Sequence, residues 1–104
     1  MAELVVIYWR DIPAQVVANH GDSSARAQLT DRFQKAIDAA AMRAGLAEMD
    51  AYLAEWRQEP RECGPDLEAE VAQEVDRLEG LHTSDVIRRL IRSGGIDDER
   101  DASR

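Results

Sequence analysis

The run from Leu4 to Val17, LVVIYWRDIPAQVV, constrains the fold of this chain more than any other stretch. Its first six residues, Leu4 to Trp9, are all apolar and rich in β-branched side chains. That composition favours a short central strand over a buried helix. Asp11-Ile12-Pro13 suits a turn, because proline fixes φ and pushes the preceding residue towards extended geometry. Ala14 to Ala18 then predicts a second strand, so we expect the sheet to begin with a β-hairpin.

The segment from Ala25 to Ala44 has the pattern of an amphipathic helix. Ser23 or Ser24 can cap its start, and Gly45 stands where a helix commonly ends in a left-handed residue. The apolar residues recur at spacings of three and four, which places them on one helical face. These residues are Leu29, Phe33, Ala36, Ile37, Ala40 and Ala44.

The segment from Met49 to Arg57 fits two patterns. Its aromatic residues alternate as on a strand, whereas its apolar residues also recur at a helical spacing. We favour a strand, since a sheet of two strands alone is only marginally stable. Gln58 to Gly64 is expected to be a loop, because Pro60 and Gly64 interrupt it.

Two helices are predicted in the last third of the chain. Pro65 suits the first position of one helix, which Gly80 would end. Thr83 or Ser84 can cap a second, shorter helix, which would end at Gly94-Gly95.

The sequence therefore predicts a single α+β domain over residues 1–95, in the order ββαβαα with about three strands. We expect the long helix to cover one face of the sheet, and the C-terminal helices to cover the other face or an edge. Residues 96–104 are polar and charged, and they are predicted to be a disordered tail.

The chain is acidic, with a formal net charge of −8. Nucleic acids and anionic membranes attract clustered Lys and Arg, so this charge argues against both as partners. No apolar run approaches the length of a membrane span, and the N-terminus lacks the pattern of a secretion signal. Cys63 is the single cysteine, which excludes a disulfide within the chain. We expect a cytoplasmic protein.

No catalytic motif is recognisable. Cys63 with His20 or His82 could in principle form a nucleophile and base, but the neighbouring Glu62 would raise the thiol pKa. One cysteine and two separated histidines do not give the spacing of a metal site. There is also no glycine motif for phosphates. We predict no catalytic residue, no metal and no cofactor, and we lean against an enzyme.

The hairpin tip is the best candidate for recognition. Trp9-Arg10-Asp11 would project an aromatic ring and two charges, and Trp and Arg are enriched at binding hot spots. The alternative is that Arg10 and Asp11 satisfy the turn and pair with the long helix. Tyr52 and Trp56 are either core residues or part of an apolar groove. The predicted binding residues are Trp9, Arg10, Asp11, Gln15, Tyr52 and Trp56.

Three segments, VVIYWRDIPAQV, RFQKAIDAAAMRAG and DAYLAEW, resemble a small bacterial domain family known as "virulence factor". The likeness is good over residues 1–57 and weaker beyond, where LEAE at 67–70 and LIRSGG at 90–95 are compatible. The family name reflects a phenotype and assigns no catalytic residue. The domain also occurs in the larger conserved virulence factor C proteins, beside scaffold-like and helical-repeat regions. The resemblance therefore implies an adaptor or accessory role, and for stand-alone members a link to folate- and corrinoid-dependent one-carbon metabolism.

Two kinds of function follow as expectations. The first is a non-enzymatic accessory module that binds a protein partner, or forms a homodimer, through the hairpin or a sheet edge. The second is a small-molecule-binding or catalytic subunit in one-carbon metabolism. In that case Arg10, Asp11 and Gln15 would be polar groups in an apolar pocket lined by Trp9 and Trp56.

Overall fold

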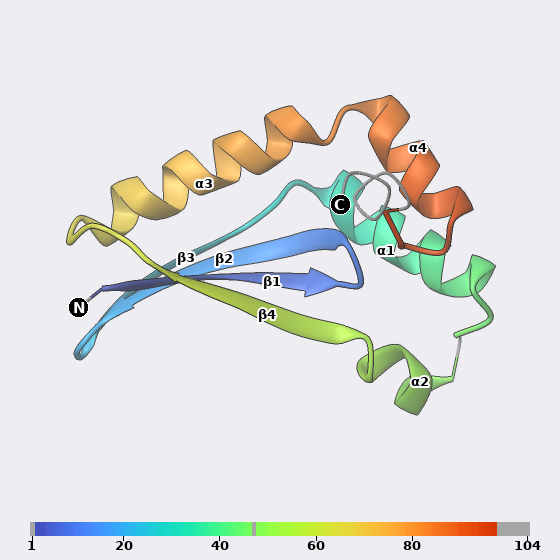
Figure 1. The fold of residues 1–104 in the computed structure, drawn as a ribbon, viewed down its shortest axis with the longest axis horizontal. Coiled ribbons are helices and arrows are strands. Elements are labelled where there is room, and N and C mark those ends of the chain that lie inside the picture. Colours follow the sequence, from blue (N-terminus) through green and yellow to red (C-terminus); the bar gives the residue numbers. More distant parts are fainter. Residues whose placement is uncertain (1, 47, 98–104) are drawn as a thin grey trace.

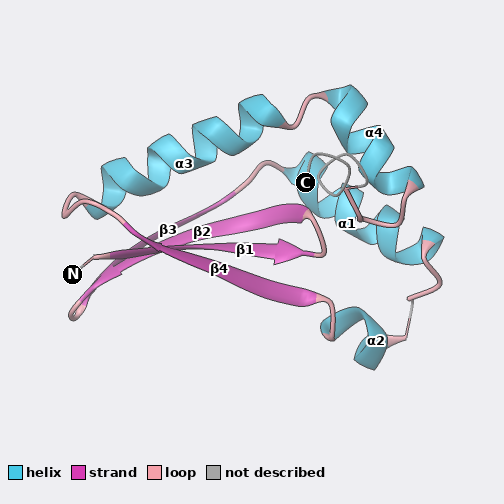
Figure 2. Cartoon of the chain, viewed as in Figure 1, coloured by secondary structure: helices cyan, strands magenta, loops and turns pink. Residues whose placement is uncertain are grey.

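A computed structural model of the chain describes residues 2–46 and 48–97. Within them, a four-stranded antiparallel sheet is combined with four helices (Figures 1 and 2). The elements are β1 (Glu3–Trp9), β2 (Ile12–His20), β3 (Ser23–Gln28), α1 (Asp31–Arg43), α2 (Met49–Leu53), β4 (Trp56–Glu62), α3 (Leu67–Leu81) and α4 (Ser84–Arg92). The strands lie in the order β3-β2-β1-β4. The α+β class is confirmed, whereas the order along the chain is βββααβαα rather than ββαβαα.

The predicted hairpin is present, but its turn is shorter than expected. Arg10 and Asp11 form the turn, and Pro13 is a buried residue of β2. The pairing shifts by one residue after Ile7, because Ile7 lies opposite Gln15 and Tyr8 opposite Pro13. This irregularity is a β-bulge, which bends the strand and re-aims its side chains.

The predicted start of the long helix at Ala25 is wrong. Residues Ser23–Gln28 form an edge strand paired with β2, in which Ala25 and Ala27 pack against the core. Helix α1 begins six residues later, at Asp31. Its end is as predicted: Gly45 has a φ of 75°, and the N–H groups of Gly45 and Leu46 donate to the carbonyls of Met42 and Ala41 at 3.2 and 2.9 Å. This pair of bonds is a Schellman motif.

The predicted strand at 49–57 and the predicted loop at 58–64 are also wrong. Met49–Leu53 forms the short helix α2, and β4 starts only at Trp56. β4 then pairs with β1 as far as Glu62, through the supposed loop breaker Pro60. An edge strand tolerates a proline because one of its sides has no strand to bond.

Side-chain caps mark the starts of the last two helices, but α3 begins at Leu67 rather than at Pro65 as predicted. The carboxylate of Asp66 accepts a hydrogen bond from the N–H of Ala69 at the start of α3, at 3.3 Å. The hydroxyl of Thr83 does the same for Val86 in α4, also at 3.3 Å, which confirms Thr83 as the cap. α3 continues through Gly80 to Leu81.

The sheet has one covered face and one open face. α3 lies over β2 and β3, while α1 and α4 pack on each other near the hairpin tip, on the same side of the sheet (Figure 1). The expectation that the C-terminal helices cover the other face or an edge is therefore wrong. The core fills the space between helices and sheet, and its largest fully buried side chains are Trp9, Phe33, Leu4, Ile12, Ile37, Leu78, Leu90, Val16 and Pro13. Apart from α2 at the Trp56 end, no helix of residues 2–46 and 48–97 covers the opposite face.

Most of the predicted polar tail lies outside the described residues. Its first two residues, Ile96 and Asp97, are described, and the N–H of Asp97 donates to a carboxylate oxygen of Asp11 at 2.7 Å. The end of the described chain is therefore held at the hairpin tip.

Candidate functional site

Arg10 at the hairpin tip is bonded to two segments that lie far away in the sequence. Its Nε donates to Oε1 of Glu55 at 2.6 Å, and its Nη1 donates to the carbonyl of Gly94 at 3.0 Å. Its backbone N–H also donates to the carbonyl of Glu55 at 3.0 Å. Arg10 has a φ of 52°, which is uncommon for a residue with a side chain. These bonds hold it in that conformation.

Asp11 completes the same cluster. One carboxylate oxygen accepts from Nη2 of Arg57 at 3.0 Å, and the other accepts from the N–H of Asp97. Arg57 also donates from Nε to the carbonyl of Arg10 at 2.8 Å. Asp11 donates its own backbone N–H to the carbonyl of Gly95 at 2.8 Å. The turn is thus clamped between β4 and the residues after α4, and its charged partners are not on α1 as the sequence suggested.

Trp9 is fully buried beside this clamp. Its ring N–H donates to the carbonyl of Tyr52 at 2.9 Å, and its ring stacks on that of Tyr52 with centroids 5.7 Å apart. Tyr52 in turn meets Trp56 edge to face at 6.0 Å. Gly95 packs so closely that a Cβ there would lie 2.9 Å from the Trp9 ring. Trp9 is therefore part of the core rather than an exposed anchor.

The structure separates the six predicted residues into two groups. Trp9, Arg10, Asp11 and Tyr52 belong to the clamp, which holds the two ends of the domain together. Gln15 and Trp56 instead line the same hollow of about 420 Å³ on the open side of the sheet. The remaining residues of this hollow are Ile7, Ala14, Gln28, Leu29, Asp31 and Gln34.

A second hollow adjoins the first on the open face and shares Ile7 with it. It measures about 320 Å³ and is lined by Val5, Ile7, Val17, Asn19, Arg26 and Gln58. The middle of this face consists of aliphatic and amide side chains in two rows of the sheet. One row holds Arg26, Val17, Val5 and Pro60, and the next holds Gln28, Gln15, Ile7 and Gln58. Arg26 is the one charged residue in these two rows.

Three of the four charged residues of β4 lie on the side of the sheet where the helices are. Arg57, Glu59 and Arg61 pair with Tyr8, Val6 and Leu4, the residues of β1 that face the helices. Its open side instead carries Trp56, Gln58, Pro60 and Glu62. The helix side of β4 is itself largely exposed, because α3 lies mainly over β2 and β3, and the Glu59 and Arg61 side chains there are 48% and 50% exposed.

The charges of β4 border a cleft of about 120 Å³ against α3. Glu74 of α3 is only 3% exposed there, and its carboxylate accepts from Arg77 at 2.5 and 3.0 Å and from Arg61 at 3.3 Å. The hydrogen bonds from Arg77 outweigh burial and lower the pKa of Glu74. Burial, reinforced by Glu59, raises the pKa of Tyr8 at the cleft wall. One feature of the sequence could have indicated that Glu74 is buried: it lies on the same helical face as Val71 and Leu78.

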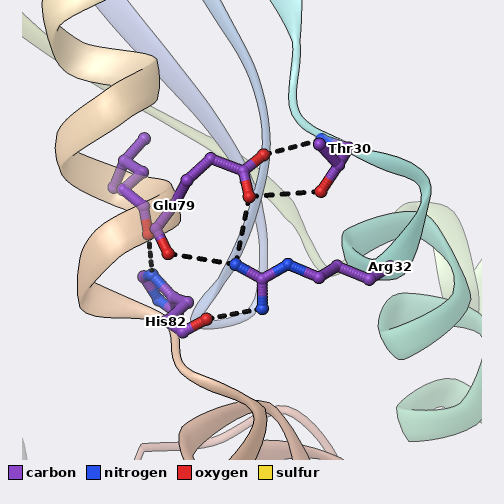
Figure 3. Close-up of polar contacts among 5 residues, drawn as sticks. Thr30, Arg32, Glu79 and His82 are labelled. Carbon is purple, nitrogen blue, oxygen red and sulfur yellow. Dashed lines mark hydrogen bonds and ion pairs between the residues drawn. The ribbon is translucent and has the colours of Figure 1, made fainter.

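A second polar network joins the start of α1 to the end of α3 (Figure 3). The Glu79 carboxylate accepts from the N–H and hydroxyl of Thr30, at 2.8 and 3.1 Å. Arg32 donates to the carbonyls of Glu79 and His82, at 3.0 and 2.6 Å. The acidic Glu79 thus lies at the N-terminus of α1 and the cationic Arg32 lies at the C-terminus of α3, and the helix dipoles favour both placements. Burial would raise the pKa of Glu79, but the bonds from Thr30 and Arg32 outweigh it and lower this pKa.

Two of the residues considered for catalysis, Cys63 and His82, have shifted pKa values. Burial, with Glu70 nearby, raises the pKa of the Cys63 thiol, which disfavours the reactive thiolate. Burial lowers the pKa of His82. The Nδ1 atom of His82 lies 2.8 Å from the carbonyl of Leu78, and its ring packs edge to face against Phe33. Among the described residues, no three His, Cys, Asp or Glu side chains come together as a metal site would need. No described helix has the length and apolar character needed to cross a bilayer.

The fold and surface define a small α+β domain with an internally clamped hairpin and a one-sided sheet. The chain belongs to the "Virulence factor" family, whose family model matches residues 7–91. The match includes the hairpin tip, most of the open face and most of α4; it begins after Val5 and ends before Gly94, Gly95 and Asp97. No significant match was found among curated proteins or among solved structures.

Proposed function

We propose that this chain is a non-enzymatic protein-interaction module, an accessory part of a larger cytoplasmic assembly. Its recognition surface would be the open face of the sheet. The observation that supports this is the scarcity of charge at the middle of the open face, where Gln58 and Pro60 of β4 lie, whereas Arg57, Glu59 and Arg61 lie on the other side of that strand.

Charge depletion distinguishes this surface from the rest of the molecule. A third of the residues in the chain are charged, yet the two middle rows of the open face contain only Arg26. Depletion of charge at the centre of a patch, rather than bulk hydrophobicity, is what marks protein interfaces. Ile7 and Val17 would contribute apolar area at about 25 cal/mol per Å² buried, whereas Val5 is only 9% exposed and has little left to bury. The partner surface that suits this face is uncharged at its centre.

Site-specific photo-crosslinking in the native host tests the proposal. A photoreactive amino acid would replace Gln58 on the open face or, as the matched control, Gln73 on the exposed side of α3. We expect Gln58 to give a defined protein adduct and Gln73 to give none. Equal yields at the two positions, or no adduct from Gln58, would overturn the proposal.

A small-molecule-binding role in one-carbon metabolism is the second candidate function. It is favoured by the 420 Å³ hollow, which lies within the size range of ligand pockets and brings Gln15 and Trp56 together. Arg10 and Asp11 would not contribute to it, since the clamp engages both side chains. A thermal-shift screen against folates and cobalamins tests this role, and stabilisation should disappear in Trp56→Ala. No stabilisation by any of these compounds would exclude it.

A further inference from the structure

We infer that the occupant of the open face is a second copy of this chain, packed sheet to sheet about a two-fold axis parallel to the strands. The inference rests on the proposed function, because it names the partner of the same surface. It is supported by the arrangement of the few charges around that surface and by how the rows of the face match themselves.

The basic residue of the open face lies on one edge strand, and its acidic residues lie on the other edge strand and on the neighbouring β1, where Glu3 is paired with Glu62. Arg26 is on β3, the edge strand at one side, and Glu62 is on β4, the edge strand at the other. The row that contains Arg26 also contains Val17, Val5 and Pro60, and Glu62 lies in the next row, two residues further along β4. Two residues of a strand span about 7 Å.

A two-fold axis parallel to the strands places β3 of one copy over β4 of the other. Arg26 then lies over Pro60 of the second copy, one row from Glu62 of the second copy. Packed sheets are about 10 Å apart, a gap that an arginine side chain spans together with the glutamate. Symmetry produces this ion pair twice, as in every isologous interface.

The same axis places each row of the face over the same row of the second copy, so that Gln15 also lies over Ile7 of the second copy. It sets Val17 over Val5 of the second copy, and it sets Gln28 over Gln58 of the second copy, where the two amides can bond to each other. An axis perpendicular to the strands would instead place β3 over β3 and bring the two copies of Arg26 to the same edge. Like charges facing each other are unfavourable, so the charges select the parallel axis.

The size and charge of the face indicate a weak dimer. Seven residues of β1 and four strands give a footprint of about 24 by 19 Å, or roughly 450 Å² per copy. This is below the about 800 Å² per partner of a standard interface, so we expect a dissociation constant of roughly micromolar order. Each copy carries a net charge of −8, and the uncharged centre of the face keeps most of the acidic residues out of the contact.

Sedimentation velocity of the full chain over a wide concentration series tests the inference. The wild type should show a reversible monomer–dimer equilibrium. R26E and E62R should each weaken it by about tenfold, because two ion pairs become two like-charge contacts. The double variant R26E/E62R should restore it, since the charges are exchanged. Arg92→Glu on the exposed side of α4 is the control for net charge and should leave the equilibrium unchanged.

Each outcome of these experiments either supports or contradicts the second copy as the occupant of the open face. A wild type that stays monomeric at every concentration, or a double variant as weak as R26E, would overturn the second copy as the occupant. Circular dichroism of each variant separates loss of association from loss of fold. If the chain is monomeric and Gln58 still crosslinks to a different protein, the second copy is overturned and the proposed function stands. If it is monomeric and Gln58 crosslinks to nothing, both fail.

Discussion

The clamp at the hairpin tip predicts that Arg10 matters for stability. Arg10→Ala removes two charge-assisted bonds, to Glu55 and to Gly94, at a site where the Arg10 and Glu55 side chains are 20% and 33% exposed. Bonds to charged groups contribute about 1.5–3 kcal/mol each when buried. Partial exposure reduces this, so we expect a loss of about 2 kcal/mol in the free energy of unfolding. For a domain of this size that corresponds to roughly 10 °C in Tm.

Arg10→Gly is the matched variant, because it removes the same side chain and also relieves the positive φ of 52°. Left-handed backbone costs an L-residue about 1–2 kcal/mol, part of which glycine loses again through its entropy in the unfolded chain. We expect Arg10→Gly to be about 0.5–1 kcal/mol more stable than Arg10→Ala in urea unfolding. Arg10→Ala within about 0.5 kcal/mol of the wild type, or Arg10→Gly less stable than Arg10→Ala, would refute the structural role of the clamp.

Three further predictions concern stability and reactivity. Gly95→Ala should lower the unfolding free energy by about 2–4 kcal/mol, because its φ is +92° and its Cβ would press on Trp9; an unchanged Tm would contradict this. Glu74→Gln should cost about 1–2 kcal/mol at neutral pH. The pKa of Glu74 is lowered in the folded state, so its contribution to stability is present above its unfolded-state pKa and is lost as the pH falls through its folded-state pKa. The difference in unfolding free energy between Glu74→Gln and the wild type, measured in urea, should therefore shrink in acid. A difference that stays constant with pH would refute this role of Glu74. Cys63 should react with a disulfide reagent more slowly than an unfolded control at neutral pH, since the pKa of its thiol is raised. Equal rates would show that the pKa of this thiol is not raised.

Elements with local signals were predictable from the sequence. The β1–β2 hairpin followed from a continuous apolar run, and the end of α1 followed from Gly45. The Thr83 cap of α4 was likewise visible in the residue types. In each case the physical cause lies within a few residues, so a sequence pattern is enough to identify it.

The edge strands were missed because they lack the composition of buried strands. β3 reads SSARAQ, and the residues it turns to the core are only Ala25 and Ala27, which also suit a helix. β4 reads WRQEPRE, and its pairing with β1 holds it in place although Pro60 interrupts it. Tertiary pairing overrides local propensity at such edges.

The candidate site was predictable only in part, because its contacts are long-range. Two of the predicted residues, Gln15 and Trp56, line the same hollow, but Arg10 bonds to residues 45 and 84 positions away. No spacing in the sequence reveals such partners. The open face itself was also not predicted, because its existence depends on which side of the sheet the helices pack against.

The central claim is that protein covers the open face in the working molecule, and cysteine footprinting in intact host cells tests it most directly. In a Cys63→Ser background, a cysteine at Gln58 reports the open face, and one at its exposed neighbour Glu59 reports the opposite side of the same strand. Alkylation by a permeable maleimide should be several-fold slower at 58 than at 59 in cells, and the difference should vanish in dilute purified protein. Equal labelling at 58 and 59 in cells would contradict the account.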